Sequence, residues 1–116
     1  MIYEQQLLIV ETLRNANGYI TWHRATGDNV ELLHLKVSEP RHGTGTYLLR
    51  QMLHRLQFDP PYATVFGFTR VSNTVAQSFY KAMGFELTTV KGVYADGQAV
   101  VFSQNFKELL RIHNVA

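Results

Sequence analysis

The chain has 116 residues and a formal net charge of +2 at pH 7, and 46% of its residues are hydrophobic. This length predicts a single domain, residues 1–116, with enough apolar side chains for a modest core. The absence of cysteine excludes disulfides, thiolate metal sites and a cysteine nucleophile. Lysines and arginines are scattered singly, which argues against a nucleic-acid groove and leaves ordinary solubility or a small anionic ligand as explanations of the charge.

The amino-terminal sequence MIYEQQLLIV has neither the basic segment nor the apolar run of a signal peptide. No stretch approaches the roughly 18 apolar residues that span a membrane. With the lack of cysteine, these features predict a cytoplasmic protein that does not bind membranes. We also expect no metal, because no pair of the five histidines has helical ligand spacing with a carboxylate.

The first part of the chain predicts three antiparallel strands. Residues 7–12 are apolar enough for a strand, and NANG (15–18) is a turn signal before a return strand at 19–24. TGDN (26–29) is a second turn, and 31–37 reads as a third strand. Simple alternation places one set of side chains on one face of this strand, Glu31, Leu33, Leu35 and Val37, and another set on the opposite face, Leu32, His34 and Lys36.

The second part of the chain predicts helices and strands in alternation. A helix at 46–57 carries one apolar stripe, and the prolines of DPP (59–61) end it. A buried strand at 63–69 precedes an amphipathic helix at 73–85, capped by Ser72 or Asn73 and closed by Gly84. A hairpin around ADG joins strands at 87–94 and 98–103, and 107–113 reads as a short terminal helix. The stripe of the first helix consists of Leu48, Leu49, Met52, Leu53 and Leu56.

The order of elements is therefore β-β-β-α-β-α-β-β, apart from the terminal helix. Strands that flank two helices favour one mixed sheet in an α/β (α+β) domain, and we expect a helix on each face of that sheet.

The segment RHGTGT (41–46) lies between a predicted strand and a predicted helix. A helix N-terminus exposes unpaired N–H groups, and glycines let the backbone approach a ligand closely, so the segment suits a phosphate. It is neither a Walker A loop nor a dinucleotide fingerprint. Taken alone, the two glycines are equally well explained as a tight turn.

The glycine segment and the helix after the next strand resemble motifs of the GNAT superfamily, the GCN5-related N-acetyltransferases. The family has a Gln/Arg-x-x-Gly-x-Gly/Ala loop, and later a helix reading Asn-x-x-Ala-x-x-Phe-Tyr-x-x-x-Gly-Phe. The first is matched by Gly43-Thr44-Gly45, although Pro40 stands at the Gln/Arg position. The second is matched throughout, by Asn73, Ala76, Phe79, Tyr80, Gly84 and Phe85.

The resemblance implies acetyl-CoA as co-substrate and assigns residues to it. Backbone N–H groups of His42, Gly43, Thr44, Gly45 and Thr46 would hold the pyrophosphate, with Arg41 and His42 at the lip of the site. The strand edge from Leu35 to Val37 would pair with the pantetheine arm. Asn73 would contact the pantetheine, cap its helix, or do both.

The resemblance also suggests roles in catalysis. Tyr80 would donate a proton to the departing CoA thiolate, where an unrelated sequence would simply bury a tyrosine. Glu31 would accept the proton of the attacking amine, although a solvated glutamate at a strand end would look the same. His34 is an alternative base, expected on the opposite face, and Trp22 and His23 are weaker candidates for lining an acceptor site.

These features predict an acetyl-CoA-dependent N-acetyltransferase in which an acceptor amine attacks the thioester directly. The alternative is a non-catalytic acyl-CoA-binding or regulatory module. The family fold usually begins with a strand and two helices that are not expected here, and those helices wall the acceptor site. We therefore expect a homodimer, and a small-molecule or peptide amine as acceptor.

Overall fold

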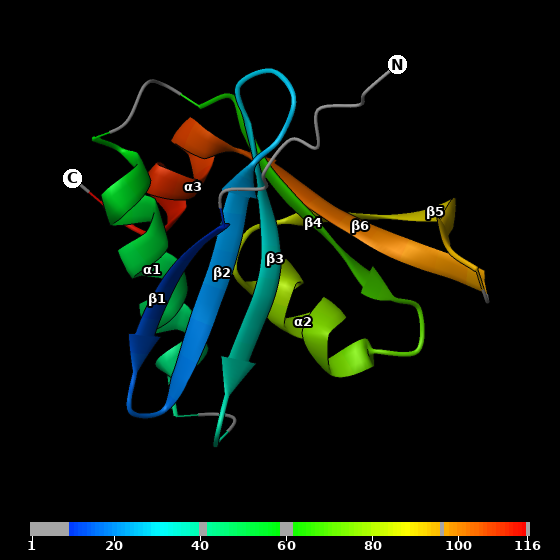
Figure 1. Ribbon diagram of the computed structural model, residues 1–116, viewed down its shortest axis with the longest axis horizontal. Coiled ribbons are helices and arrows are strands. Elements are labelled where there is room, and N and C mark those ends of the chain that lie inside the picture. Colours follow the sequence, from blue (N-terminus) through cyan, green and yellow to red (C-terminus); the bar gives the residue numbers. More distant parts are fainter. Residues whose placement is uncertain (1–9, 40–41, 59–61, 96, 116) are drawn as a thin grey trace, which may run out of the picture.

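The computed structural model describes residues 10–39, 42–58, 62–95 and 97–115 (Figure 1). These residues form six strands and three helices. The strands are β1 (Val10–Asn15), β2 (Gly18–Arg24), β3 (Asn29–Val37), β4 (Thr64–Arg70), β5 (Glu86–Tyr94) and β6 (Gly97–Asn105). The helices are α1 (Thr44–Leu56), α2 (Thr74–Ala82) and α3 (Phe106–Ile112). The predicted order, including the short terminal helix, is confirmed, and most boundaries shift by one to three residues.

The strands form one mixed sheet in the order β1-β2-β3-β4-β6-β5. The first three strands are antiparallel, β3 and β4 are parallel, and β6 lies antiparallel between β4 and β5. The predicted mixed sheet is thus confirmed. Parts of two predicted features, the start of the strand at 7–12 and the prolines at 59–61, lie outside the described residues.

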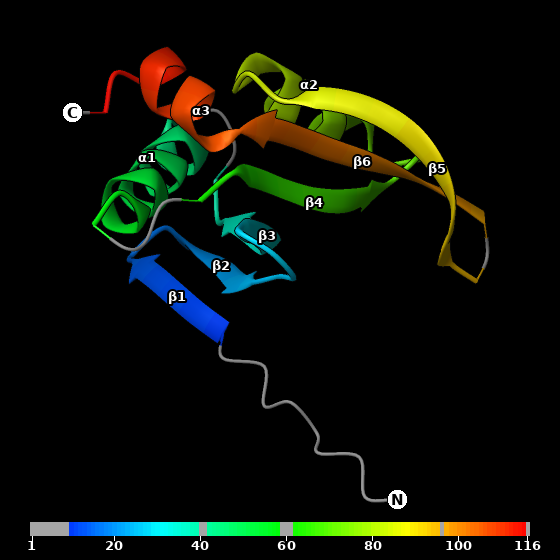
Figure 2. The same ribbon diagram turned by 90° about the horizontal axis from the view of Figure 1, so that it is seen from above.

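All three described helices pack on the same face of this sheet, which Figure 2 shows from above. We expected helices on both faces, and that placement is wrong. The chain crosses from β3 to β4 through α1, and from β4 to the parallel strand β5 through α2. Both crossovers move in the same direction along the sheet, and since such connections are right-handed, both helices fall on one side.

The hydrophobic core lies between this helix layer and the sheet. The predicted stripe of α1, from Leu48 to Leu56, is fully buried and packs with apolar side chains of β2, β3 and β4. Leu109 of α3 and Phe102 of β6 continue the same cluster toward α2. The core therefore fixes α1 over β1, β2 and β3, and α2 over β5 and β6, on the same face of the sheet.

A fork opens between the two parallel strands near the middle of the sheet. β3 and β4 pair only at Asn29–Thr64, Val30–Val65 and Glu31–Phe66, and they separate beyond that point (Figure 1). Gly67 follows the last paired residue of β4. A Cβ atom there would lie 2.3 Å from the Phe102 ring and 2.7 Å from the Leu32 carbonyl oxygen, so only glycine fits where the strands begin to part.

A β-bulge changes the faces of β3. Trp22 pairs with Leu32 whereas Thr21 pairs with His34, so β3 carries one extra residue opposite β2. The bulge reverses the alternation. The core side chains Leu32 and Val30 therefore share a face with Leu35 and Val37, and Glu31 lies on the opposite face together with His34. The predicted alignment of Glu31 with Leu35 and Val37, and its separation from His34, are both wrong.

Among the described residues, no helix has the length and apolar character needed to cross a membrane.

Candidate active site

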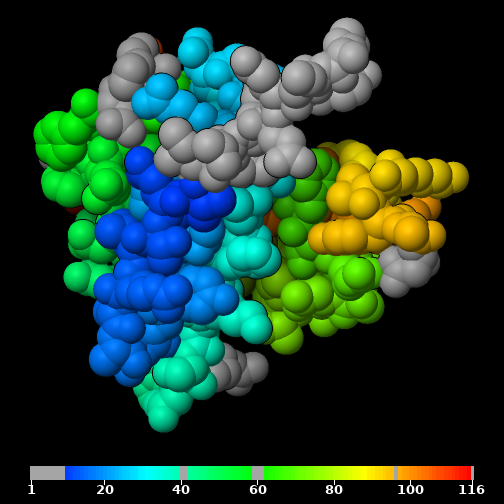
Figure 3. Space-filling model, in the orientation of Figure 1, coloured from blue at the N-terminus to red at the C-terminus, as the bar shows by residue number. Residues whose placement is uncertain are grey.

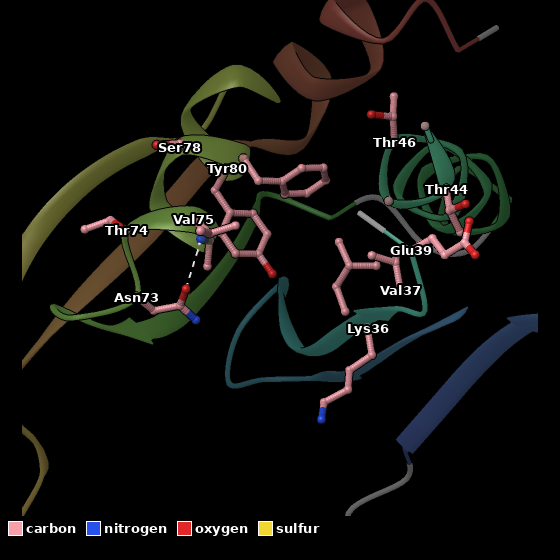
Figure 4. A pocket seen from close by; sticks show the side chains of 15 residues that line it. Lys36, Val37, Glu39, Thr44, Thr46, Asn73, Thr74, Val75, Ser78 and Tyr80 are labelled. Carbon is pink, nitrogen blue, oxygen red and sulfur yellow. Dashed lines mark hydrogen bonds between the residues drawn. The ribbon is translucent and has the colours of Figure 1, made fainter. Parts of the chain in front are cut away.

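A pocket of about 730 Å³ lies on the helix side of the fork, between the second half of β3 and the N-termini of α1 and α2 (Figure 4). Figure 3 shows the face of the sheet opposite the helices, where the surface is also hollowed between β3 and β4. The lining of the pocket comes from three segments far apart in sequence. The residues are Leu35, Lys36, Val37, Glu39, Gly43, Thr44, Gly45, Thr46, Asn73, Thr74, Val75, Ala76, Ser78, Phe79 and Tyr80.

The N-terminus of α1 opens into this pocket without a side-chain cap. Gly43 occupies the N-cap position with φ 76°, a left-handed conformation that favours glycine. The first backbone hydrogen bond of the helix runs from the Tyr47 N–H to the Gly43 carbonyl. The N–H groups of Thr44, Gly45 and Thr46 precede this bond, so they carry the partial positive charge of the helix end toward the pocket.

The second glycine of the segment has a packing role. A Cβ atom on Gly45 would lie 3.0 Å from the Phe79 ring of α2, and the Thr46 hydroxyl lies 3.5 Å from the Met83 sulfur. The first turn of α1 is therefore held directly against α2. Gly43 faces open space instead, since no atom of the described residues beyond its chain neighbours lies within 4 Å of an added Cβ.

The N-terminus of α2 lines the pocket from the other side, and it is capped. The Asn73 side-chain oxygen accepts a hydrogen bond from the Ala76 N–H at 3.1 Å, drawn as a dashed line in Figure 4. This leaves the amide NH₂ of Asn73 as a donor beside the pocket. Thr74, Val75 and Ser78 follow along the pocket lining, and the side chains of Thr74 and Ser78 point away from the pocket (Figure 4).

Tyr80 is the one buried residue of α2. Its ring stacks on Phe102 of β6 with centroids 3.7 Å apart, and edge contacts to Phe79 and Phe85 complete an aromatic cluster. Its hydroxyl points into the pocket toward β3 (Figure 4). Burial raises the pKa of Tyr80 to about 12, so the phenol stays protonated at neutral pH and can act as a hydrogen-bond or proton donor.

The pocket brings together most of the predicted cofactor residues, from β3, the glycine segment and α2. His42 is not among its lining residues, and it lies 3.6 Å from Glu39 in a mostly exposed pair. Arg41 and Pro40 lie outside the described residues. Sequence reasoning missed Lys36, Thr74, Val75 and Ser78, although a helix that presents Asn73 to a pocket also presents the turn that follows it.

Glu31 does not line the pocket but lies on the other face of the sheet. Its carboxylate oxygen Oε1 is 2.8 Å from Nε2 of His23, its cross-strand partner on β2. Trp22 points the opposite way and is only 2% exposed within the core. The prediction that Trp22 and His23 line one acceptor site is therefore wrong for Trp22, because successive residues of a strand face opposite sides.

Within the described ranges, no three His, Cys, Asp or Glu side chains gather where they could share a metal ion.

No family model matches the sequence, and no curated protein is similar to it in sequence. The fold, in contrast, matches solved structures of GNAT acetyltransferases. A structure from Desulfovibrio desulfuricans assigned to the GNAT family is 18% identical with a TM-score of 0.71, over 84% of this chain and 69% of that one. The chain therefore has the fold of the GNAT superfamily.

Two further structures show the same similarity. The ribosomal-protein-S18-alanine N-acetyltransferase from Escherichia coli is 21% identical with a TM-score of 0.68, over 87% of this chain and 72% of that chain. Arabidopsis thaliana Naa50, in complex with the bisubstrate analogue CoA-Ac-MVNAL, is 24% identical with a TM-score of 0.63, over 76% and 64%. At these identities the similarity establishes the fold alone.

Proposed function

We propose that this protein is an acetyl-CoA-dependent N-acetyltransferase. One observation carries the proposal: a single pocket contains the uncapped N-terminus of α1, the edge of β3 that faces the fork, and the protonated hydroxyl of Tyr80. The first suits a phosphate, the second an extended amide chain and the third a departing thiolate. The GNAT fold and the bisubstrate complex of a similar structure support the same reading.

The residues present fit the donor. The N–H groups at the start of α1 would bind the pyrophosphate, and the missing side chain of Gly43 would let the phosphates approach the backbone. Beyond Glu31, β3 has no strand partner on the fork side, so the segment Leu35–Val37 would pair with the two amides of the pantetheine arm.

The thioester of acetyl-CoA supplies the acetyl group, and the side chains of this protein would manage the protons. Glu31 would accept a proton from the acceptor ammonium group, directly or through water, so that the amine nitrogen can form its bond to the acetyl carbon. A backbone N–H near Val37 would stabilise negative charge on the carbonyl oxygen. Tyr80 would give its proton to the sulfur as the carbon–sulfur bond breaks.

The two proton-handling residues lie on opposite sides of the fork. Tyr80 points into the pocket on the helix face, whereas Glu31 lies on the face that no described helix covers. The acceptor would therefore approach from the uncovered face. A small-molecule or peptide amine, a homodimer and a cytoplasmic location remain predictions from the sequence.

The proposal is tested with wild type and Tyr80→Phe, by following release of the CoA thiol with a panel of amines, peptides and polyamines. Loss of a general acid typically costs about 10²-fold or more in rate, and we expect a loss of this size with little change in the Kd for acetyl-CoA. Tyr47→Phe is the matched control, because Tyr47 is exposed on α1 and does not line the pocket.

The other outcomes separate the alternatives. Binding of acetyl-CoA without turnover on any acceptor would favour the non-catalytic acyl-CoA-binding module. Failure of the folded wild-type protein to bind acetyl-CoA at all would contradict both. Equal rates for wild type and Tyr80→Phe would remove Tyr80 from the mechanism while leaving the transferase assignment intact.

A further inference from the structure

A histidine–carboxylate pair lies on the sheet face opposite the helices, at the base of the fork. His23 and Glu31 face each other across β2 and β3, and His23 Nε2 lies 2.8 Å from Glu31 Oε1. Their side chains are 15% and 24% exposed. Glu31 is also the last residue of β3 that pairs with β4, opposite Phe66. The pair therefore stands where the two parallel strands separate.

The surroundings leave His23 as the main described polar partner of Glu31. Val10 of β1 is the cross-strand neighbour of His23, and Phe66 of β4 is the neighbour of Glu31. Because of the bulge, His34 is the next titratable residue on this face of β3, and it is exposed. Within the described part of the chain, no other ion pair involves either member.

We infer that His23 is a positioning residue for Glu31, which would serve as proton acceptor for the incoming amine; the inference rests on the proposed function. Neutral His23 donates its Nε2–H to Oε1, which fixes the carboxylate and leaves Oε2 as the acceptor oxygen. The tautomer follows from this role, because a carboxylate accepts and does not donate.

With these roles, every proton and bond of the acetyl transfer is accounted for. One proton moves from the acceptor ammonium group to Glu31, and the nitrogen lone pair forms the bond to the acetyl carbon. The carbon–sulfur bond breaks with its electron pair on sulfur, which takes the Tyr80 proton. The nitrogen loses its second proton to water as the amide forms, Glu31 releases its proton to water and Tyr80 regains one from water, so each turnover releases one net proton and needs no further reactant.

The test compares His23→Gln and His23→Leu with wild type, measuring kcat/KM from pH 5 to 9 and the Kd for acetyl-CoA. We expect the pH profile of kcat/KM to differ between wild type and His23→Gln, because glutamine keeps the hydrogen bond to Glu31 but carries no ionisable group. Because glutamine still donates a hydrogen bond, His23→Gln should keep most activity at pH 8. His23→Leu should lose about tenfold in kcat/KM, since it removes a hydrogen bond to a charged group.

Thermal unfolding and the Kd for acetyl-CoA, both expected to change little, separate this role from a general loss of structure. His54→Gln is the control, because His54 is exposed on α1, bonded to Gln57, and should leave the pH profile unchanged. If wild type turns over but His23→Leu keeps its rate and its pH profile, the role of His23 is wrong and the proposed function stands. If folded wild type acetylates no amine, the proposed function fails and this role falls with it.

Discussion

The N-termini of α1 and α2 meet at the same pocket, but only α2 has a side-chain cap for its first N–H groups. At α2 the Asn73 side chain accepts a hydrogen bond from the Ala76 N–H. At α1 the N-cap is Gly43, which has no side chain to do this, and Thr44 follows with no capping bond. Neither helix has an acidic residue in its first turn that would compete with an anion.

The difference separates a helix end built for stability from one suited to a ligand. A cap contributes about 1 kcal/mol to the stability of a helix, so a helix end without one forgoes that stabilisation. The long apolar stripe of α1, fully buried in the core, keeps the helix in place without it. The shorter α2 buries only Tyr80 and depends more on its cap. This contrast supports the proposal that α1 binds the anion and that α2 supports Tyr80.

The largest expected effect comes from adding a methyl group at the uncapped end. Gly43→Ala should lower the affinity for CoA by about tenfold or more, since displaced charge-assisted hydrogen bonds to phosphate are worth about 1.5–3 kcal/mol each. Among the described residues, no atom beyond the chain neighbours lies within 4 Å of the new Cβ, so it would occupy space open to the ligand. Isothermal titration calorimetry with CoA measures the change.

Gly92→Ala is the matched control for this substitution. Gly92 of β5 also has a left-handed φ, 85°, and open space around its Cβ position, but it does not line the pocket. Both variants should lose about 1–2 kcal/mol of stability from backbone strain. Equal CoA affinities for the two variants would mean that α1 does not bind the phosphates.

The two helix ends also show how much of the candidate site could be predicted from the sequence. The spacing from Asn73 to Phe85 was enough to predict the helix, with Ser72 or Asn73 as its cap, whereas the role of Tyr80 at the cofactor was implied by the resemblance to the GNAT motif. The glycine segment predicted the start of α1, but it could not tell that Gly43 faces the pocket while Gly45 packs on Phe79. That distinction depends on the contact between α1 and α2, which no local pattern contains.

The errors have physical causes of the same kind. The bulge at Leu33 and His34 reverses the alternation of β3, and neither a glycine nor a proline marks it in the sequence. Placing both helices on one face requires knowing that the steps from β3 to β4 and from β4 to β5 run in the same direction across the sheet. Strand order is a long-range property, so the handedness rule could be applied only after the sheet was known.

A smaller effect is expected at the capped end. Asn73→Ala should lower the free energy of unfolding by about 1 kcal/mol, because the Ala76 N–H loses its acceptor. Urea unfolding measures this change. Asn105→Ala is the parallel control, since the Asn105 side chain caps α3 through the Glu108 N–H and does not line the pocket. A similar loss of stability in both, with weaker CoA binding only in Asn73→Ala, would give Asn73 a second role at the ligand.

The smallest effect is expected from Asn73→Asp. This substitution separates the capping role of the side-chain oxygen from the role of the amide NH₂ as a donor to the ligand. Asn73→Asp keeps an oxygen for the Ala76 N–H and places a negative charge at the helix N-terminus, so stability should stay the same or rise by about 0.3–1 kcal/mol. It also removes the amide donor beside the pocket and brings a carboxylate near a polyanion. CoA affinity should therefore fall a few-fold at low ionic strength and recover partly in salt, because screening weakens the repulsion. If the affinity for CoA is unchanged and independent of salt, Asn73 acts only as the helix cap. The N-terminus of α2 would then serve stability alone, in contrast to that of α1.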